Sequence, residues 1–554
     1  MADRVQVTLR VEGMTCDGCA RHVTKALNAV PGVLESRVPT WQGGKATVLM
    51  DTSVQDEDLI RAVMEAGYYA VVVERRPVAG DRHFALHGET EYDLMVLGGG
   101  SAGFAAAIKG AELGARVAIV EGSTIGGTCV NVGCVPTKTL IAAAEICYHS
   151  AYPMFEGLPT CPPPQDWQRV VAQKDELVEA LRKGKYIDVM AIYPNITLIE
   201  GRARLIGRRY VEVNGRRYLP GKIIIATGAS PWAPPIPGLE EVGYLDSTGA
   251  LSLPALPESL VVIGGGPIGL ELAQLFHRFG VRVTIVEAAP RIAAGEDVEI
   301  SEALASYLEE EGIQVHSGIR ITHVERTSSG KAVCGEVQGR PCTFEGSEIL
   351  VATGRRPNTR GLGLEEAGVQ VGQRGEILVN EHLQTTNPDI FAAGDVLGDP
   401  QFVYVAAYGG GVAAENALTG SGRVYDLTAL PRVTFTDPQI ASVGYTEAQA
   451  RERGIPVKTA VLSLKDVPRA IAARNTRGLI KLVAEEGTDR LLGAHVLAAN
   501  AGEVIQEAVL AIRFGLTIQD LIDTFHPYLT MVEGLKLAAL AFTKDVARLS
   551  CCAT

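Results

Sequence analysis

The pattern of apolar and polar positions first marks a small domain at the start of the chain. Residues 5–11 alternate in polarity, as a half-buried strand does, and a helical repeat follows from Ala20 to Val30. The same periodicities then predict a strand, a helix and a last strand, at residues 46–50, 54–66 and 70–74, and the order of elements needs one further strand near residues 33–38, which are apolar enough. The order βαββαβ predicts a separate domain over residues 1–74. The polar residues 75–91, broken by proline and glycine, predict a flexible linker.

After the linker, the pattern twice repeats one larger unit, in which a strand, a glycine-rich loop, a helix and a second strand lead to an acid. In the first unit these parts are residues 92–97, 98–103, 104–113, 116–120 and Glu121. In the second they are residues 260–263, 264–269, the helix that carries Glu271, residues 281–286 and Glu287. Gly-x-Gly-x-x-Gly lets the backbone approach a pyrophosphate at the helix start, and the acid binds a ribose 2′-hydroxyl. Two Rossmann-like domains with two nucleotides are therefore expected.

The rest of the body also alternates strands with helices, which predicts an α/β fold. Strands that enter glycine turns are expected at residues 223–228 and 351–354, and a helix over residues 177–193. The last part of the chain predicts strands and then helices at residues 432–435, 478–484, 491–496, 501–514, 518–522 and 531–545. The body is expected to divide into two nucleotide domains and a final α+β domain, over residues 92–255 with 361–427, residues 256–360, and residues 428–554.

Composition and charge narrow the function classes. A net charge of −13 over 554 residues argues against nucleic acid as a partner. No uninterrupted apolar run approaches the ~20 residues of a membrane span, and the first residues lack the apolar core of a signal peptide. Ten cysteines in a chain of this length do not form a secreted disulfide scaffold. A cytoplasmic protein that keeps reactive thiols is expected.

A pair of cysteines follows the first nucleotide unit, within Gly-Gly-Thr-Cys-Val-Asn-Val-Gly-Cys-Val-Pro-Thr-Lys at residues 126–138. The helical pattern that starts after Cys134 would stabilise a thiolate, because unpaired N–H groups at a helix start favour negative charge. Cys129 and Cys134 are therefore predicted to be a redox dithiol held against a bound cofactor. A structural zinc pair would more often show Cys-x2-Cys with two further ligands, and a buried pair of small apolar residues is the other alternative.

This cysteine motif resembles the redox-active site of the flavin disulfide reductases, which include glutathione reductase, dihydrolipoamide dehydrogenase and mercuric reductase. The resemblance implies that the first unit binds FAD and that the second binds NAD(P)H. It also implies that Cys134 lies against the flavin, that Cys129 is the exchanging thiol, and that Lys138 pairs with Glu271. The FAD contacts would be Gly98, Gly100, Ser101, Ala102, Gly103, Glu121, Gly127, Thr128, Lys138, Gly228, Gly394 and Asp395. The last domain would form a homodimer.

The electron donor depends on the acid that ends the second unit. Gly264, Gly266 and Gly269 form the expected NAD(P)H loop, and Glu287 favours a free ribose 2′-hydroxyl over a 2′-phosphate. Arg291 lies four residues further along but does not replace the acid. This physical argument favours NADH, whereas mercuric reductases mostly use NADPH.

The N-terminal domain carries a second cysteine pair, in Gly-Met-Thr-Cys-Asp-Gly-Cys at residues 13–19. Two soft thiolates at the start of a helix suit a near-linear d10 ion such as Cu(I) or Hg(II) better than tetrahedral zinc. The motif resembles the heavy-metal-associated domain of copper and mercury carriers. Cys16 and Cys19 are therefore expected to bind metal, with a thioredoxin-like or a purely structural pair as alternatives, and the choice between Cu(I) and Hg(II) stays open.

The C-terminal segment distinguishes between the members of the family. Disulfide reductases of the glutathione and lipoamide type carry His-Pro-Thr-x-x-Glu, in which the glutamate orients a histidine that moves protons. Here the stretch after His526 places Tyr528 and Met531 at the threonine and glutamate positions, and Glu533 comes two residues late. An incomplete acid–base pair argues against thiol substrates. The stretch resembles mercuric reductases, in which that tyrosine and a second one, here Tyr186, lie near the metal.

The chain ends with adjacent cysteines, Cys551 and Cys552, which also resembles mercuric reductases. Adjacent cysteines near a chain end are expected to be exposed, and their disulfide would be strained, so metal transfer suits them, with an inert tail as the alternative. The expected route runs from Cys16 and Cys19 through this tail to the Cys129–Cys134 pair of the other subunit. There Hg(II), received as a thiol complex or from a membrane transporter, would be reduced to volatile Hg(0) for mercury detoxification. A lipoamide-type reductase with an added metal-binding domain and a copper carrier are the rival hypotheses.

Overall fold

The computed structural model describes residues 4–38, 40–41, 43–78, 90–160 and 166–548. The chain forms two compact units, Met1–Gly88 and Glu89–Thr554, and each is described by itself. Residues 79–89 of the predicted linker and the Cys551-Cys552 tail lie outside the described residues. None of the helices within the described ranges combines the length and apolar character needed to cross a membrane.

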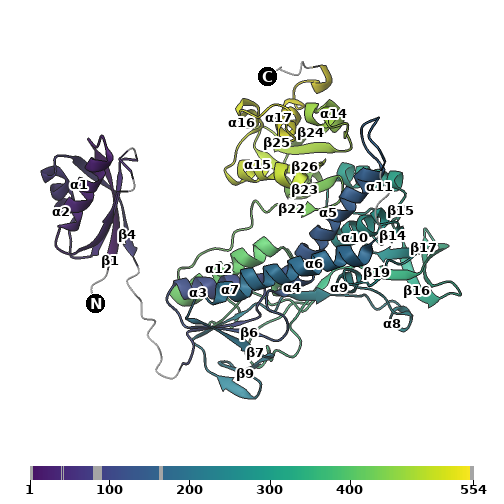
Figure 1. The fold of residues 1–554 in the computed structure, drawn as a ribbon, viewed down its shortest axis with the longest axis horizontal. Helices are drawn as coiled ribbons and strands as arrows, with labels where there is room; N and C mark the ends of the chain where they lie inside the picture. The colour runs from purple at the N-terminus through teal and green to yellow at the C-terminus, as the bar shows by residue number, and fades with distance from the viewer. Residues whose placement is uncertain (1–3, 39, 42, 79–89, 161–165, 549–554) are drawn as a thin grey trace. The chain divides into compact units, whose positions relative to one another are not determined.

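The first unit is a four-stranded antiparallel sheet with two helices on one face (Figure 1). Its elements are β1 (Arg4–Glu12), α1 (Asp17–Asn28), β2 (Val33–Arg37), β3 (Lys45–Asp51), α2 (Asp56–Glu65) and β4 (Tyr69–Val78). The strand order is β2-β3-β1-β4, and the core between sheet and helices includes Val7, Leu9, Val23, Val48 and Leu59. The predicted α+β, ferredoxin-like order βαββαβ is confirmed.

The last strand of this unit is longer than the sequence predicted, because β4 ends at Val78 rather than at residue 74. Arg75, Arg76 and Pro77 pair with the start of β1. Since β4 is an edge strand, one side of its backbone needs no hydrogen-bonded partner, and a proline is tolerated there. The first part of the predicted linker is therefore strand.

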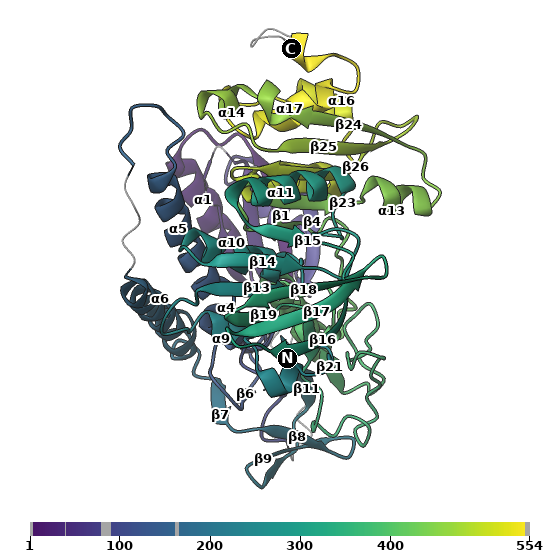
Figure 2. The same cartoon turned by 90° about the vertical axis from the view of Figure 1, so that its right-hand side faces the viewer.

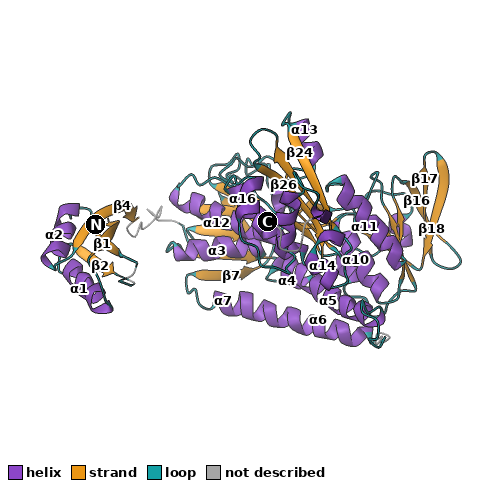
Figure 3. Cartoon of the chain, turned by 90° about the horizontal axis from the view of Figure 1, so that it is seen from above, coloured by secondary structure: helices purple, strands orange, loops and turns teal. Residues whose placement is uncertain are grey.

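The first domain of the second unit is built on a parallel sheet in the order β21-β11-β5-β6-β7. These strands are β5 (Leu94–Leu97), β6 (Val117–Glu121), β7 (Ile196–Glu200), β11 (Lys222–Ile225) and β21 (Ile390–Ala392). Helices α3 (Ser101–Glu112) and α12 (Val403–Thr419) lie side by side (Figures 1 and 3), so that a Cβ on Gly410 would come within 2.1 Å of the Ala102 carbonyl oxygen. Because β21 and α12 come late in the chain, two separate segments build this domain. A smaller sheet consists of β8 (Ala203–Ile206), β9 (Tyr210–Val213) and β10 (Arg216–Tyr218).

The second domain repeats the parallel arrangement, in the order β15-β14-β13-β19 (Figure 2). Its main elements are β13 (Ser259–Ile263), α10 (Pro267–Arg278), β14 (Arg282–Val286), α11 (Val298–Glu311), β15 (Gln314–His316) and β19 (Glu348–Val351). An antiparallel sheet of β16 (Arg320–Arg326), β17 (Lys331–Val337) and β18 (Arg340–Gly346) is added to it. Shorter elements join the two domains: β12 (Ala229–Pro231), α8 (Leu239–Val242), α9 (Ser247–Ala250) and β20 (Arg355–Pro357).

Two long helices connect the nucleotide domains. They are α5 (Cys134–Ala151) and α6 (Trp167–Arg182), and Trp167 packs against Phe276 and Phe279 near the end of α10. The helix predicted over residues 177–193 begins earlier, because the Asp166 side chain caps it by accepting from Arg169 N. It also changes winding: Lys183–Ile187 form a π-helical turn before α7 (Asp188–Met190).

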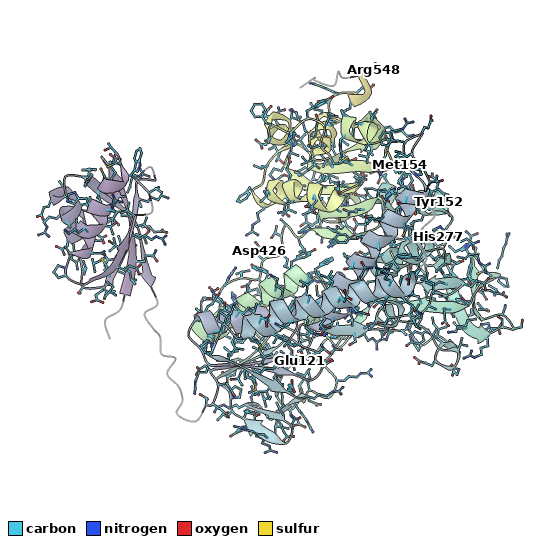
Figure 4. All side chains as sticks on the ribbon, in the orientation of Figure 1. Glu121, Tyr152, Met154, His277, Asp426 and Arg548 are labelled. Atoms are coloured by element: carbon cyan, nitrogen blue, oxygen red, sulfur yellow. The ribbon has the colours of Figure 1, made fainter. Side chains whose placement is uncertain are left out.

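The third domain is an antiparallel sheet in the order β22-β23-β26-β25-β24, with helices packed on it. Its elements are β22 (Arg432–Thr434), β23 (Gln439–Gly444), α13 (Glu447–Glu452), β24 (Val457–Ser463), α14 (Pro468–Ala472), β25 (Leu479–Glu485), β26 (Leu491–Ala498), α15 (Ala501–Arg513), α16 (Ile518–Asp523) and α17 (Glu533–Leu540). The sequence missed β23 and β24. It also predicted the last helix too long, because the exposed Thr543, Lys544 and Asp545 offer no apolar face. Arg548, the last residue described, lies at the edge of this domain (Figure 4).

Candidate active site

The first cysteine pair lies where β1 turns into α1. Cys16 Sγ and Cys19 Sγ are 3.4 Å apart, and Thr15 Oγ1 lies 3.7 Å from Cys19 Sγ. The pKa of Cys19 is lowered to about 6 by hydrogen bonds, first with the backbone of Thr15 and then with the Tyr68 hydroxyl. Cys16 is exposed, so both sulfurs can reach one ion from outside. A partly ionised, accessible thiol pair fits the expected binding of a soft metal ion.

The two glycine loops of the second unit have matching geometry. Glu121 (Figure 4) accepts hydrogen bonds from Gly99 N and Ser123 N, both at 2.7 Å. Glu287 accepts from Gly265 N at 2.5 Å and from Ala289 N at 2.6 Å. Each acid therefore fixes its loop and stands where a ribose would come.

The third glycine of each loop is required by packing. A Cβ on Gly103 would lie 1.8 Å from the carbonyl oxygen of Gly98, and one on Gly269 would lie 2.0 Å from that of Gly264. Both helices thus start against their own strands. Around the second glycine of the second loop, Gly266, no atom lies within 4 Å of a Cβ position, which leaves room for a pyrophosphate.

A cavity of about 1590 Å³ joins the first glycine loop, the cysteine motif and the start of α10. This space exceeds the 300–1,000 Å³ of common small-ligand pockets, as a large dinucleotide requires. Burial raises the pKa of Asp395 at its wall. The wall contains all the residues predicted to contact FAD except Gly103: Gly98, Gly100, Ser101, Ala102, Glu121, Gly127, Thr128, Lys138, Gly228, Gly394 and Asp395. The residues present therefore fit FAD.

Cys129 and Cys134 lie on two consecutive helices, α4 (Gly127–Asn131) and α5. Cys134 is the first residue of α5 and is exposed to the cavity, whereas Cys129 is half-buried. Gly127 has a φ of +63°, and a Cβ there would lie 2.6 Å from Gly100 Cα. A glycine is therefore needed to bring the cysteine motif against the first glycine loop.

The two thiols differ in acidity. Cys129 donates a hydrogen bond to Cys134, which lowers the pKa of Cys134 to about 7, and the positive charge of Lys138 acts in the same direction. The same hydrogen bond, together with burial, raises the pKa of Cys129. Near neutral pH the exposed sulfur is thus partly a thiolate and the half-buried one a thiol, which is a reactive arrangement for soft metals and disulfides.

Lys138, on α5, is held by groups from the other two domains of the second unit. Its Nζ lies 2.5 Å from Glu271 Oε2 on α10 and 4.5 Å from the centre of the Phe435 ring. Glu271 is buried, and its other oxygen accepts from Phe435 N at 2.9 Å. The pairing of Lys138 with Glu271 that the resemblance implied is present, and the sequence had not indicated Phe435.

Arg291 does not point toward the ribose acid of the second loop. Its guanidinium donates to the carbonyl oxygens of Ala294 and Glu296, at 3.1 and 3.0 Å. The guanidinium of Arg291 is therefore bonded to these carbonyl oxygens, whereas the Glu287 carboxylate accepts from backbone N–H groups of its loop.

Tyr186 lies in the π-helical turn, beside the cysteine motif. Its ring meets Phe104 edge to face, with centroids 4.8 Å apart, and a Cβ on Gly126 would lie 3.4 Å from it. Burial raises the pKa of Tyr186, and negative charge on Cys129 and Cys134 adds to this effect. A π-turn often marks a functional site, because the extra residue redirects a side chain.

The histidine of the C-terminal stretch has an acid partner, which contradicts the expectation of an incomplete pair. His526 Nε2 lies 2.7 Å from Glu507 Oε1, and this hydrogen bond raises the pKa of the histidine. The His526 side chain is only 2% exposed. The sequence motif did not reveal this acid, because Glu507 lies on α15, 19 residues before the histidine, and not at the Met531 position.

Tyr528 follows this histidine and is 51% exposed. Among the described residues that line the cavity, none comes from this loop. Another residue that the sequence did not indicate is Arg355, which reaches the cysteine motif, 3.4 Å from Thr128 Oγ1. The sequence feature that could have indicated Arg355 is the Arg-Arg-Pro that follows the predicted strand over residues 351–354.

Three segments of the chain match known protein families. Residues 92–410 match the pyridine nucleotide-disulphide oxidoreductase family, and residues 430–539 match the dimerisation domain of that family. Residues 8–69 match the heavy-metal-associated domain.

Similar proteins extend over the whole length of the chain. The chain is 46% identical to the mercuric reductase of Lysinibacillus sphaericus over 546 residues, which are 98% of this chain and 99% of that protein. It is 47% identical to the mercuric reductase of Staphylococcus aureus, over 98% of each protein. Among solved structures, the chain resembles the HOCl-induced flavoprotein disulfide reductase RclA from Escherichia coli, with a TM-score of 0.72 and 34% identity. That similarity covers 81% of this chain and 99% of that one.

Proposed function

Because the chain belongs to the mercuric reductase family of the pyridine nucleotide-disulphide oxidoreductases, we propose that it reduces Hg(II) to volatile Hg(0) with electrons from NAD(P)H. The observation that carries this proposal is the position of Cys129 and Cys134. Both line one cavity with the FAD-type glycine loop and with the start of α10. The physiological role would be mercury detoxification.

In this mechanism the two sulfurs bind the substrate. Hg(II) is a soft d10 ion, and two thiolates suit it better than oxygen or nitrogen ligands. Cys129 would be the thiol that exchanges with a thiol complex of Hg(II), and Cys134, with its pKa lowered to about 7, would be the partly ionised second ligand near neutral pH. Cys129 would lose its proton as the metal binds, because a bound cation replaces that proton. When bound, FAD supplies the two electrons that reduce Hg(II), taken from the nicotinamide.

The remaining site residues hold and orient these groups. Glu121 and the first glycine loop would bind the FAD ribose and pyrophosphate, and Gly264, Gly266 and Gly269 would bind those of NAD(P)H. Lys138, fixed by Glu271, keeps a positive charge beside the dithiol and lowers the pKa of Cys134. Tyr186, which lies beside the cysteine motif, would contribute its hydroxyl to the dithiol site near Cys129.

For the electron donor, the proposal is NADH. Glu287 stands at the ribose position of the second loop, and Arg291 is bonded to carbonyl oxygens instead of being free for a phosphate. A 2′-phosphate would therefore meet an uncompensated carboxylate.

A homodimer would complete the site. The match to a dimerisation domain supports this state, and large apolar side chains on the third domain are open to solvent, with Phe525 100% and Phe514 72% exposed. In the dimer, Tyr528 would approach the dithiol of the partner subunit. Cys551 and Cys552 would pass Hg(II) to that dithiol by thiolate exchange, which avoids free Hg(II).

The N-terminal domain would capture the ion through Cys16 and Cys19 and deliver it from its linker, which raises the local concentration. A membrane transporter is one source of that ion. Because the route needs free thiols, we place the protein in the cytoplasm.

The contact between His526 and Glu507 favours a second candidate function, reduction of a small disulfide of the lipoamide type. An acid-oriented histidine can protonate a leaving thiolate, and this chain has one. The N-terminal domain would then be an added metal-binding module.

Purified full-length protein with excess small thiol distinguishes these functions. Hg(II)-dependent NAD(P)H oxidation with trapped Hg(0) is expected, at a higher kcat/KM for NADH than for NADPH. Replacing Cys551 and Cys552 with alanine should abolish Hg(II) turnover under excess thiol. Turnover of lipoamide without Hg(0) release would instead establish the second candidate.

A further inference from the structure

A further cluster of side chains whose types can bind a metal ion lies on the three-stranded sheet of β16, β17 and β18. Figure 3 shows this sheet at the edge of the second unit, and in Figure 2 the sheet faces the viewer. Its inner face packs on the core of the domain, through Val324, Val333 and Phe344. Side chains alternate along a strand, so the neighbouring His323, Glu325 and Cys334 share the outer face.

These three side chains converge. His323 and Cys334 are direct partners across β16 and β17. His323 Nε2 lies 3.8 Å from Glu325 Oε2, and Cys334 Sγ lies 3.9 Å from Glu325 Oε1. One nitrogen, one sulfur and one oxygen, all within 4.8 Å of one another, thus surround a common point. Tetrahedral zinc bonds of 2.0–2.3 Å place ligand atoms roughly 3.3–3.8 Å apart, so small rotations of these side chains would suffice.

A hydrogen bond already orients the His323 ring for metal binding. A bulge between Ile321 and His323 adds Thr322 to the strand, and bulges commonly redirect a side chain. Thr322 Oγ1 donates to the carbonyl oxygen of Cys334 at 3.1 Å and lies 3.1 Å from His323 Nδ1. Because its proton is used, the hydroxyl oxygen accepts from Nδ1–H, which leaves the Nε2 lone pair free on the side of Glu325. Such a partner on the second ring nitrogen is typical of metal-binding histidines.

We propose that His323, Glu325 and Cys334 form a binding site for Zn²⁺ or a cation of the same class. Imidazole, thiolate and carboxylate together select a borderline d10 ion with four ligands, and water would take the fourth position. The thiolate and the carboxylate offset the charge of the ion. Glu345 adds negative charge nearby, since it and Glu325 are both partners of Ala332.

This site is independent of the mercury chemistry proposed above. The same sheet also contains a second cysteine, which serves as a matched control for Cys334. Cys342 lies on the neighbouring strand, but it packs with the core on the opposite face. Cys342→Ser therefore changes a cysteine of the same sheet without altering the cluster of His323, Glu325 and Cys334.

The test uses the full-length chain with Cys16, Cys19, Cys551 and Cys552 replaced by serine and the Cys129–Cys134 pair kept oxidised. Zn²⁺ binding is measured by equilibrium dialysis, and ¹¹³Cd NMR reports the ligand types. One bound equivalent is expected in this background and in its Cys342→Ser variant, with a ¹¹³Cd signal of mixed sulfur, nitrogen and oxygen ligation. Cys334→Ser should lose that signal, and Thr322→Val should weaken binding by about 10-fold.

His323→Ala gives an independent reading, because it removes a ligand and leaves the thiol in place. It is expected to reduce Zn²⁺ affinity by more than Thr322→Val does. Binding that is unchanged in both Cys334→Ser and His323→Ala would overturn the proposal, as would a background chain that binds no Zn²⁺. Flavin content measured in parallel confirms that each variant is folded.

Discussion

Lys138 Nζ lies 2.5 Å from Glu271 Oε2, and this ion pair joins the helix of the cysteine motif to the helix of the second glycine loop. Glu271 is buried and also bonds Phe435 N, so the pair links three domains. A buried carboxylate is costly without a charged partner, and Lys138 supplies that partner for Glu271. Its position beside Cys134 then connects the domain arrangement to the acidity of the dithiol.

The two members of this pair should shift the acidity of Cys134 in opposite directions. Lys138 lowers the pKa of Cys134 and Glu271 raises it. Lys138→Met should therefore move the pH midpoint of Cys134 alkylation up by roughly one pH unit, and Glu271→Gln should move it down. The midpoint is measured on the reduced protein by iodoacetamide labelling at different pH values, with mass spectrometry of the Cys134 peptide.

Lys222→Met is a suitable control for this experiment, because Lys222 forms a similar ion pair with Asp389 in the same domain, at 2.6 Å. Its midpoint should equal that of the wild type. A midpoint that moves the same way in Lys138→Met and Glu271→Gln would show that the effect is structural and not electrostatic.

The choice of electron donor should depend on Glu287. Glu287→Gln removes the negative charge that would repel a 2′-phosphate, while the amide oxygen can still accept from Ala289 N. The ratio of kcat/KM for NADH to that for NADPH is expected to fall about 10-fold or more, mainly through better use of NADPH. Steady-state kinetics with both donors measure it, and Glu258→Gln, an exposed acid of the same domain, should leave the ratio unchanged. An unchanged ratio in Glu287→Gln would remove the argument for NADH.

The features that the sequence predicted correctly are those determined by short spacing. The glycine loops, the acids that follow them and the Cys-x4-Cys motif each lie within a few residues or within one βαβ unit. Their geometry follows from local backbone rules, such as the absence of a Cβ at Gly103 and Gly269. Most elements of the N-terminal domain were also predicted from local periodicity, and the strand near residues 33–38 was inferred from the order that the domain needs.

The features that the sequence did not predict depend on contacts between distant segments. Glu507 meets His526 only because α15 packs beside the C-terminal loop, and Phe435 reaches Glu271 only when three domains assemble. The π-turn that carries Tyr186 likewise has no local signal, because its composition is that of an ordinary helix. A motif comparison that tests one position, here Met531, cannot find an acid supplied by another helix.

The bond between His526 and Glu507 should make stability depend on pH. The pKa of His526 is raised in the folded protein, so its contribution is complete below the unfolded value of about 6.5 and is lost as pH rises through the folded value. Glu507→Gln should therefore reduce the free energy of unfolding by about 1–2 kcal/mol at pH 5.5 and by less at pH 9. Urea unfolding at both pH values measures the difference.

Glu503→Gln, an exposed residue on the same helix, is the control for this prediction and should show no dependence on pH. The same variants also separate the two candidate functions. If the histidine protonates a leaving thiolate, Glu507→Gln should slow lipoamide reduction and leave Hg(II) reduction unchanged. Equal destabilisation at both pH values would contradict the charged hydrogen bond.

The loop that carries Cys16 and Cys19 should owe part of its thiol reactivity to Tyr68. Its hydroxyl is the second largest cause, after the backbone of Thr15, that lowers the pKa of Cys19 to about 6. Tyr68→Phe removes only that oxygen and keeps the ring that meets His22 edge to face, with centroids 6.0 Å apart. The pKa of Cys19 should rise, so that alkylation of Cys19 at pH 6 slows several-fold while the rate above pH 9 stays the same.

Tyr69→Phe is a matched control, because the adjacent Tyr69 is 57% exposed and belongs to β4. Equal rates at pH 6 in the wild type and in Tyr68→Phe would mean that the hydrogen bonds of Thr15 and Cys16 ionise Cys19 without the tyrosine, and that the tyrosine has no part in metal capture.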